Sequence, residues 1–398
     1  MRRFAAPLGI IYGLALFLAI TDHPASSAQG FDGRQIFRFD TFGDEQLWTK
    51  ELRMHEVIPS VSPQTALAVG LKVDVEALPP TVIAALQAGQ VNPADPAVTV
   101  ELLRLNAVVG VIGGFNNQGD LASIGITCAL CHSTVDNSFT AGIGRRLDGW
   151  PNRDLDVGTI VGLSPVIPDD AFSSWGPGKY DPRDHAFDGK NIITLNSPTL
   201  PVLIPPAYGL LDVPFETYTA DGSVSYWNNY VGVSQMGGQG SFNDPRIGLT
   251  IAQKPDLVTP KLAALRDYQL SLLAPTPPDG SFDAAAAARG ERLFHGKARC
   301  GGCHQPPTYT DVSSGSDPTI PLLHAPGETG MEPVYASRSA TKIGYRTAPL
   351  RGIWQHPPYF HDGSAADLLA VVNHYDTVLL LHLSANQKDD LVEFLKSL

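Results

Sequence analysis

Apolar residues recur at helical spacing near the end of the chain. Leu391, Leu395 and Leu398 fall on one face of a helix, and Ser384 before them is a residue type that caps helix N-termini. This pattern predicts a helix over residues 384–398. The same reasoning predicts further helices over residues 97–109, 263–272 and 282–294.

The helical pattern is interrupted most clearly at residues 273–281. Two consecutive prolines and a glycine there preclude a helix or a central strand. We therefore expect a linker, with an N-terminal domain over 29–275 and a C-terminal domain over 276–398. Residues 29–115 contain no recognisable metal motif, so this extension stays unassigned. The chain has 38 Gly and 33 Pro, which predicts long loops between its helices.

The first 28 residues have the pattern of an export signal. A basic start with Arg2 and Arg3 precedes an apolar run, 7–20, that is short for a membrane span. Small residues at 26–28 then offer a cleavage site, while a retained N-terminal anchor is the alternative. No later segment approaches the roughly 20 apolar residues that a span needs. We predict a periplasmic protein with no membrane span once the signal 1–28 is removed.

The overall charge limits the kinds of partner. The formal net charge is −12 at pH 7, so nucleic acid and anionic membrane surfaces would repel the chain. A basic redox partner is permitted, although an acidic surface also serves solubility alone.

All four cysteines lie in two Cys-x-x-Cys-His pentapeptides, at 128–132 and 300–304. Each is typical of a covalently attached c-type haem, because two thiols at this spacing reach the two vinyl groups of one porphyrin and the following histidine places its imidazole under the iron. Zinc or disulfides are the alternative, but zinc does not explain a histidine directly after each second cysteine. We predict two covalently bound haems c, held by Cys128, Cys131, His132, Cys300, Cys303 and His304.

The segment after the linker resembles the class I cytochrome c fold. In that fold an N-terminal helix packs on a C-terminal helix around the haem, and here the helices 282–294 and 384–398 flank the second motif. Gly290 and Phe294 lie where that family's helix contact usually does. The fold class implied is mainly α, with two cytochrome c-like haem domains that carry long loop insertions.

A further resemblance lies in residues 346–364. Pro-Leu-Arg at 349–351 and Pro-Tyr-Phe-His-Asp-Gly at 358–363 resemble motifs of the bacterial di-heme cytochrome c peroxidase and MauG family. Gly352 replaces the asparagine that is usual in that family. In the family, a short helix after this motif bears the distal ligand of the C-terminal haem.

Counting forward from the histidine of this motif as in the family points to Tyr375. The resemblance implies that Tyr375 is the sixth ligand of the second haem, where a phenolate would favour ferric and higher-valent iron. His374 and Met331 are rival ligands, and an ordinary core tyrosine is the remaining interpretation.

The resemblance also implies roles in the first domain, where Asn-Ser-Pro-Thr-Leu at 196–200 is similar to a family motif. Trp227 would relay electrons between the haems, and Gln235 would hydrogen-bond a bound peroxide, although their spacing is about two residues shorter than in the family and a structural Trp is the alternative. The family's catalytic Glu beyond Gln235 is missing, and Asp244 is the nearest carboxylate. This departure weakens the peroxidase interpretation, because the leaving oxygen needs a proton.

No histidine follows His132 where the peroxidases keep a removable distal ligand. The resemblance therefore implies a first iron that is left open. Met236, His185 and His55 are the candidates that would close it from farther along the chain.

Together these features predict a periplasmic di-heme c-type enzyme. It would reduce hydrogen peroxide with electrons from a small cytochrome or cupredoxin, or oxidise a substrate through high-valent haem as in the MauG branch of the family. A non-catalytic electron-transfer cytochrome is the alternative, and a relative that binds O₂ is a third interpretation.

The family also implies a bridging Ca²⁺, although no carboxylate cluster identifies it. Candidate partners of the haem propionates are Arg145, Arg146 and Arg351.

Overall fold

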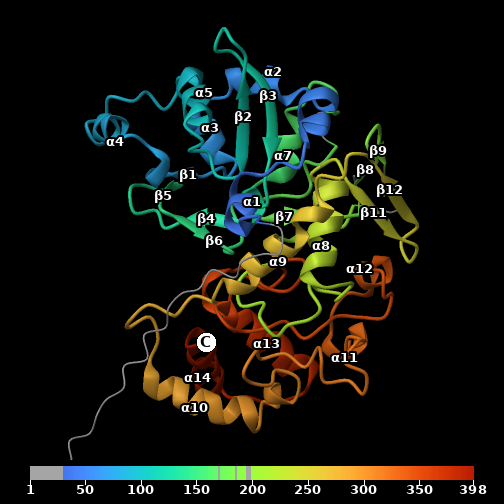
Figure 1. Cartoon of the computed structure of the whole chain (residues 1–398). Coiled ribbons are helices and arrows are strands. Elements are labelled where there is room, and N and C mark those ends of the chain that lie inside the picture. Colours follow the sequence, from blue (N-terminus) through green and yellow to red (C-terminus); the bar gives the residue numbers. More distant parts are fainter. Residues whose placement is uncertain (1–29, 169–170, 184–185, 194–198) are drawn as a thin grey trace, which may run out of the picture.

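The computed structural model describes most of the chain, namely residues 30–168, 171–183, 186–193 and 199–398 (Figure 1). The expected signal segment, His185 and most of the 196–200 motif lie outside the described residues. Within those ranges, no helix combines the length and the apolar character that crossing a membrane requires.

The extension before the first haem motif is folded and contributes to the core. Leu47 and Leu103 are buried in one hydrophobic cluster with Leu130, which lies inside the first motif, and with Trp175. The region before the motif is therefore continuous with the core around it (Figure 1). Its helices and strands are α1 (Gly33–Phe39), α2 (Met54–Val57), α3 (Pro63–Ala68), β1 (Val73–Asp74), α4 (Pro80–Gln87), α5 (Pro96–Arg104), β2 (Val111–Phe115) and β3 (Leu121–Ile126).

Helix α5 covers most of the helix predicted over 97–109. Pro96 occupies its first turn, where no backbone N–H is needed, and the side chain of Asp95 accepts a hydrogen bond from the Ala97 N–H. The helix ends at Arg104, earlier than predicted, because Asn106 adopts a left-handed φ of 52°.

The part of the chain from the first motif to the linker alternates short helices with two-residue to four-residue strands. The helix predicted over 263–272 is confirmed as α9 (Leu262–Ser271), which packs against α1. The contact is close, since a Cβ on Gly33 would lie 2.0 Å from the Ala264 carbonyl oxygen. The other elements are α6 (Ala129–His132), β4 (Ser133–Val135), β5 (Ile143–Gly144), β6 (Arg146–Asp148), α7 (Val157–Gly162), β7 (Lys179–Tyr180), β8 (Ala186–Phe187), β9 (Ile192–Ile193), β10 (Val202–Leu203), α8 (Val224–Tyr230), β11 (Ser241–Asp244) and β12 (Leu249–Ala252).

After residues 272–283, which form neither helix nor strand, the two predicted terminal helices of the second domain pack on each other. They are α10 (Ala284–His295) and α14 (Ala385–Lys396), and the rings of Phe294 and Phe394 meet edge to face at 5.0 Å. The predicted cap is confirmed, because Ser384 and Gln387 form a reciprocal capping box. Between them lie α11 (Pro326–Thr329), α12 (Pro333–Arg338) and α13 (Leu368–Val378).

The strands of the described residues form six separate two-stranded sheets and no larger one. The longest pairing is the antiparallel hairpin of β2 and β3, with a bulge at Phe115. The mainly α fold is thus confirmed only in part: helices carry the core around α10 and α14, whereas hairpins accompany them in the earlier part of the chain (Figure 1).

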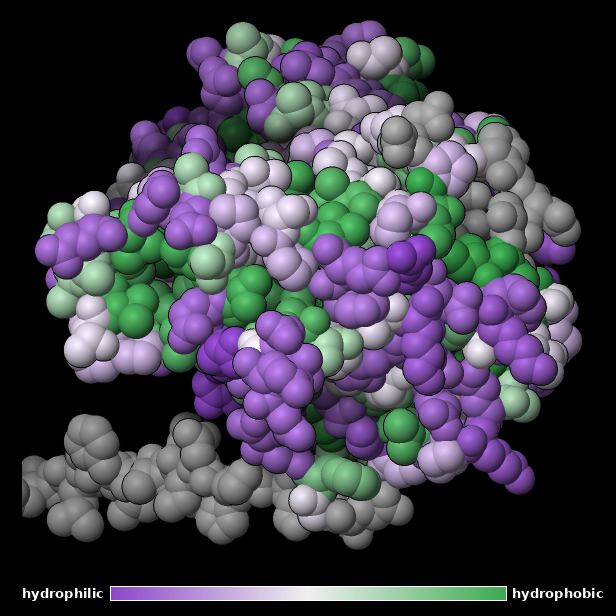
Figure 2. Space-filling view, turned by 90° about the horizontal axis from the view of Figure 1, so that it is seen from above, coloured by the Kyte–Doolittle hydropathy of each residue, from purple (hydrophilic) through white to green (hydrophobic). Residues whose placement is uncertain are grey.

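Polar and charged side chains cover much of the face shown in Figure 2, with hydrophobic side chains between them. Most of the large exposed hydrophobic residues are separated along the sequence, as on ordinary protein surfaces. On the face shown, hydrophilic and hydrophobic side chains are thus interspersed.

Gly290 offers a test of the helix contact. A Cβ there would lie 2.0 Å from the Asp390 carbonyl oxygen and 2.8 Å from the Phe394 Cβ, so Gly290→Ala forces α10 away from α14. We expect a loss of about 1–3 kcal/mol in the free energy of unfolding, measured by urea denaturation. Gly327→Ala in α11 is the control, because nothing lies within 4 Å of its Cβ position. Equal stability of the two variants would contradict the contact.

Candidate functional site

The first Cys-x-x-Cys-His motif lies on a short turn of helix whose side chains line a cavity of about 200 Å³. Cys128 precedes α6, and the His132 N–H donates to the Cys128 carbonyl, which keeps the motif in one helical turn. Cys128, Cys131 and His132 all border this first cavity. Both thiols are free, and burial raises the pKa of each to about 12.

The ring of His132 has the tautomer and the neutral state that an iron ligand needs. Its Nδ1 lies 3.1 Å from the carbonyl oxygen of Pro205, and because a carbonyl only accepts, Nδ1 carries the proton. Burial lowers the pKa of His132 to about 4, so the ring is neutral near pH 7. Its Nε2 lone pair therefore remains for a metal.

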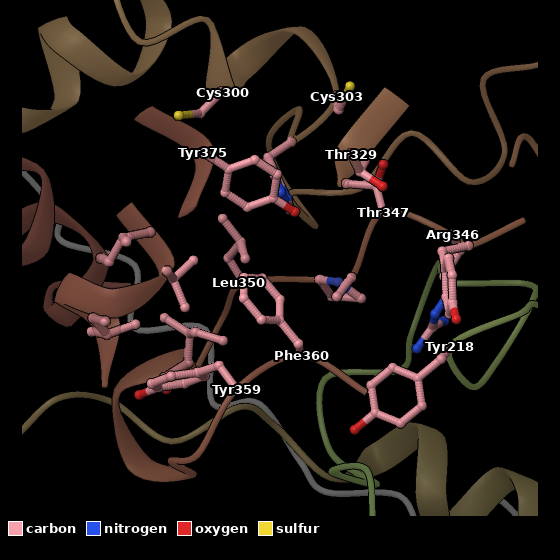
Figure 3. A pocket seen from close by; sticks show the side chains of 18 of the residues that line it. Tyr218, Cys300, Cys303, Thr329, Arg346, Thr347, Leu350, Tyr359, Phe360 and Tyr375 are labelled. Carbon is pink, nitrogen blue, oxygen red and sulfur yellow. The ribbon is translucent and has the colours of Figure 1, made fainter. Parts of the chain in front are cut away.

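The second motif repeats this arrangement in a larger cavity of about 320 Å³. Residues 300–302 form a 3₁₀ turn, and Cys300, Cys303 and His304 all line the cavity. The His304 Nδ1 donates to the Tyr309 carbonyl at 2.9 Å, and burial lowers the pKa of the ring. Figure 3 shows the two cysteines at one end of this second cavity.

The two cavities fit haem in the chemistry of their walls. Each brings two thiols and one neutral imidazole to a mostly apolar space, which is the donor set that covalent haem attachment uses. The second cavity also has unpartnered buried N–H groups on Arg153 and Arg346, suited to the carboxylates of haem propionates.

A different metal group touches the second cavity. Ligand atoms of Cys303, Asp311 and His324 lie within 4.8 Å of one another. However, His324 Nε2 lies 3.1 Å from Asp311 and its Nδ1 lies 3.0 Å from Glu328. These two carboxylates raise the pKa of His324 to about 9, so near pH 7 the ring is a cation that donates from both nitrogens.

The two cavities share a wall. Pro205, Leu210, Thr217 and Tyr218 border both of them. The Tyr218 hydroxyl donates to the Leu203 carbonyl at 3.1 Å, and its ring lies 6.1 Å from that of His361. Tyr218 faces the second cavity at the end opposite the cysteines (Figure 3). One segment of the N-terminal part of the chain therefore separates the two candidate haem sites.

Tyr375 lies in the second cavity, as the prediction of a distal ligand requires. It comes from α13, its ring points into the cavity (Figure 3), and burial raises its pKa to about 12. Of its predicted rivals, Met331 lines the same cavity, whereas the His374 Nε2 donates to the Thr329 carbonyl at 2.8 Å and does not border it.

Gln235 and Trp227 both line the first cavity. Helix α8 carries Trp227 and continues into a π-helical turn, Val231–Gln235, a feature common at functional sites. The Gln235 amide oxygen accepts from the Tyr180 hydroxyl, and its amide nitrogen donates to the Pro182 carbonyl at 3.0 Å. The Trp227 indole N–H is buried without a partner. The structure brings both predicted residues to the His132 cavity.

Several predicted residues are not brought to a cavity. Asp244 does not line the first cavity, because Arg246 pairs with it at 2.8 Å and the Tyr226 hydroxyl donates to it at 2.7 Å. This corrects the assignment of Asp244 as the acid near Gln235. His55 does not border the first cavity, whereas Met236 does.

Two of the three arginines predicted for the propionates, Arg145 and Arg146, need a similar correction. Arg145 pairs with Asp136, and Arg146 pairs with Asp74; neither lines a cavity. Arg351 borders the second cavity but donates to the Pro307 carbonyl.

Sequence reasoning missed four residues in the cavity walls. Trp48 shows that the unassigned extension reaches the first cavity, where its indole N–H donates to the Met236 carbonyl at 2.9 Å. Arg153 precedes the linker yet lines the second cavity. Glu216 lines the first cavity and pairs with Arg346 of the second at 3.1 Å. No local motif marks Trp48, Arg153 or Glu216, since each is brought in by contacts between distant segments, whereas Arg346 begins the segment 346–364 that resembles the family.

No family model matches the chain. It is 31% identical to the methylamine utilization protein MauG of Methylorubrum extorquens over 154 residues, covering 34% of this chain and 43% of that protein. The chain is similar to MauG. This confirms the resemblance to the di-heme peroxidase and MauG family, over less than half the length of that relative.

Two solved structures are also similar. One is a xenon-pressurised hydrazine synthase of Kuenenia stuttgartiensis, at 28% identity over 37% of this chain and 57% of that one, with a TM-score of 0.24. The other is a MauG-like protein associated with microbial copper homeostasis, at 19% identity over 55% of this chain and 85% of that one, with a TM-score of 0.35. TM-scores this low leave the arrangement of the elements to be judged from the chain itself.

The two attachment sites are tested by removing one thiol pair. Replacing Cys128 and Cys131 by serine should leave one haem per chain instead of two, because serine forms no thioether bond. The haem content per mole of protein and the mass of the denatured chain measure this. The double variant at Cys300 and Cys303 is the matched control and should lose the other haem. Two covalent haems in either variant would contradict the assignment.

Proposed function

We propose that the chain is a periplasmic di-heme c-type oxidoreductase that reduces hydrogen peroxide with electrons from a small cytochrome or cupredoxin. The observation that carries this proposal is the first cavity, where a neutral His132 and a fixed Gln235 amide border the same space. A site that only passed electrons would need no polar side chain held in place beside its haem. The similarity to MauG supports the same class of enzyme.

Two covalently bound haems would supply the redox chemistry, with iron held by His132 and His304. Each histidine keeps its proton on Nδ1, through the Pro205 and Tyr309 carbonyls, and offers Nε2. Because the rings are neutral at pH 7, no proton has to leave before the ligand can bind.

Gln235 and Trp227 would act on the peroxide side of the first cavity. Tyr180 and Pro182 fix the Gln235 amide from both ends, so the side chain orients a bound molecule without having to be ordered first. The buried Trp227 N–H has no partner of its own and would donate to a group bound in the cavity. Its aromatic ring remains our candidate for electron relay.

Tyr375 would act on the second haem as its distal ligand. It is buried in the second cavity and faces the attachment cysteines. A phenolate ligand favours oxidised iron, which makes oxidation of an organic or protein substrate, as proposed for the MauG branch, the second candidate function. The calcium ion implied by the family remains a prediction.

The acidic chain would receive electrons from a partner at its surface. A net charge of −12 favours a basic cytochrome or cupredoxin, since charge complementarity raises the rate of encounter. Export to the periplasm through residues 1–28 is the corresponding prediction for localisation.

The function is tested with the purified protein carrying both haems. It should consume one hydrogen peroxide for every two electrons taken from a reduced basic cytochrome, measured by the cytochrome absorbance and by residual peroxide. Gln235→Leu should slow this reaction by about 10²-fold, because one oriented hydrogen-bonding group is lost. If the wild-type protein exchanges electrons with the cytochrome but leaves peroxide intact, the protein is an electron carrier and the proposal fails.

Tyr375 is tested by spectroscopy. Tyr375→Met should change the absorption bands of one haem and leave the other unchanged, because only the second cavity contains this side chain. Tyr359→Phe is the matched control: it removes a hydroxyl in the same cavity wall, but that hydroxyl donates to the Ile353 carbonyl at 3.0 Å. An unchanged spectrum of Tyr375→Met would exclude the ligand role.

A further inference from the structure

Glu216 is the one carboxylic acid among the described residues that line the first cavity. Its side chain is only 9% exposed, and its two oxygens differ. Oε2 accepts from the Arg346 guanidinium at 3.1 Å, whereas Oε1 has no hydrogen-bond partner. Buried polar atoms are nearly always paired, so an unpartnered carboxyl oxygen in a cavity wall indicates a group that binds there.

The backbone around Glu216 is fixed on both sides. The Glu216 N–H donates to the Gly222 carbonyl at 2.8 Å, and the Arg346 N–H donates to the Tyr218 carbonyl at 2.9 Å. Between them, Thr217 has a left-handed φ of 65°, which is uncommon for a β-branched residue and is found where a site demands it. The carboxyl group is therefore held in position in the wall rather than free to turn away.

Glu216 is also the group in this wall that changes charge near neutral pH. Burial raises its pKa to about 7, although Arg346 opposes this shift. The other titratable groups facing the cavity are His132, Tyr180, Tyr218, Tyr335 and the thiols of Cys128 and Cys131. Burial raises the pKa of each thiol to about 12, so both stay neutral. Burial lowers the pKa of His132 to about 4 and raises those of Tyr218 and Tyr335, so these three stay neutral.

We infer that Glu216 is the acid that protonates the leaving oxygen of hydrogen peroxide in the first cavity, a role that rests on the function proposed above. As the O–O bond breaks, that oxygen takes the Oε1 proton and departs as water. The two electrons come from the reduced cytochrome or cupredoxin, and the second proton comes from solvent. Arg346 stabilises the carboxylate that remains until solvent returns its proton.

This assignment supplies the acid that the sequence lacks beyond Gln235. Asp244, the nearest carboxylate in the sequence, is paired with Arg246, and its pKa is lowered, so it holds no proton to give. Glu216 precedes Gln235 in the chain, and only folding brings the two side chains to one cavity.

The pH dependence of peroxide reduction tests the inference. The protein carrying both haems should react most rapidly below pH 7, and its rate constant should fall about tenfold per pH unit above it, as the acid loses its proton. Glu216→Gln should lower the rate by about 10²-fold or more and abolish this fall. Glu216→Asp keeps an acid and should retain the fall with its midpoint shifted. Asp244→Asn, which removes a carboxyl group near Gln235 in sequence that does not line the first cavity, should keep the wild-type profile.

A measurement without turnover accompanies these rates. Infrared difference spectra of the wild-type protein between pH 5 and pH 9 should contain a carbonyl band of a buried protonated carboxylic acid that is lost in Glu216→Gln, apart from any band of Asp44, whose pKa burial also raises. If that variant does not fold, a shift of this band in Glu216→Asp and the Glu216→Asp rates decide the question.

The possible failures are distinguishable. A wild-type protein that leaves peroxide intact overturns the proposed function and this role together. A wild-type protein that reduces peroxide, with a Glu216→Gln variant that matches it in rate and pH profile, overturns only the role of Glu216. An equal loss of rate at every pH would likewise assign Glu216 to structure and not to proton transfer.

Discussion

Two buried imidazoles have to be held neutral, each with its Nδ1 bonded and its Nε2 facing an apolar space. Burial keeps both rings neutral, and a backbone carbonyl fixes the Nδ1 proton at each site, from Pro205 for His132 and from Tyr309 for His304. At the first motif, the carbonyls of Cys131 and His132 already accept from the N–H groups of Asn152 and Gly149, so the partner of the His132 ring comes from another segment. A loop therefore passes each motif and supplies the carbonyl that its histidine needs.

The loop that fixes His132 also joins the two cavities. The segment that includes Pro205 continues to Thr217 and Tyr218, which border both spaces. Glu216 and Arg346 then form an ion pair across this shared wall, nearly buried on both sides. Burying such a pair costs desolvation that its attraction must offset. Its position between two candidate haem sites is more readily explained by charge and proton movement than by stability.

Local features of the sequence predicted local structure well. Helix α14 follows from the spacing of its leucines and its cap from Ser384, α10 follows from its run of alanines, and α9 was expected just before the linker. The attachment residues follow from one spacing rule. Contacts between distant segments could not be predicted in this way. Glu216, Arg153 and Trp48 reach their cavities through such contacts, which leave no periodicity or motif in the sequence. Asp244 was misassigned because proximity in sequence to Gln235 does not bring it to the same cavity.

The proposed function requires a first iron that is open to peroxide and coupled to a second haem. Low-temperature electron paramagnetic resonance of the purified ferric protein, before and after stoichiometric hydrogen peroxide, tests this directly. The account predicts one high-spin and one low-spin ferric signal, both of which diminish after peroxide. Two low-spin signals that peroxide leaves unchanged, in the oxidised and in the half-reduced protein, would contradict it.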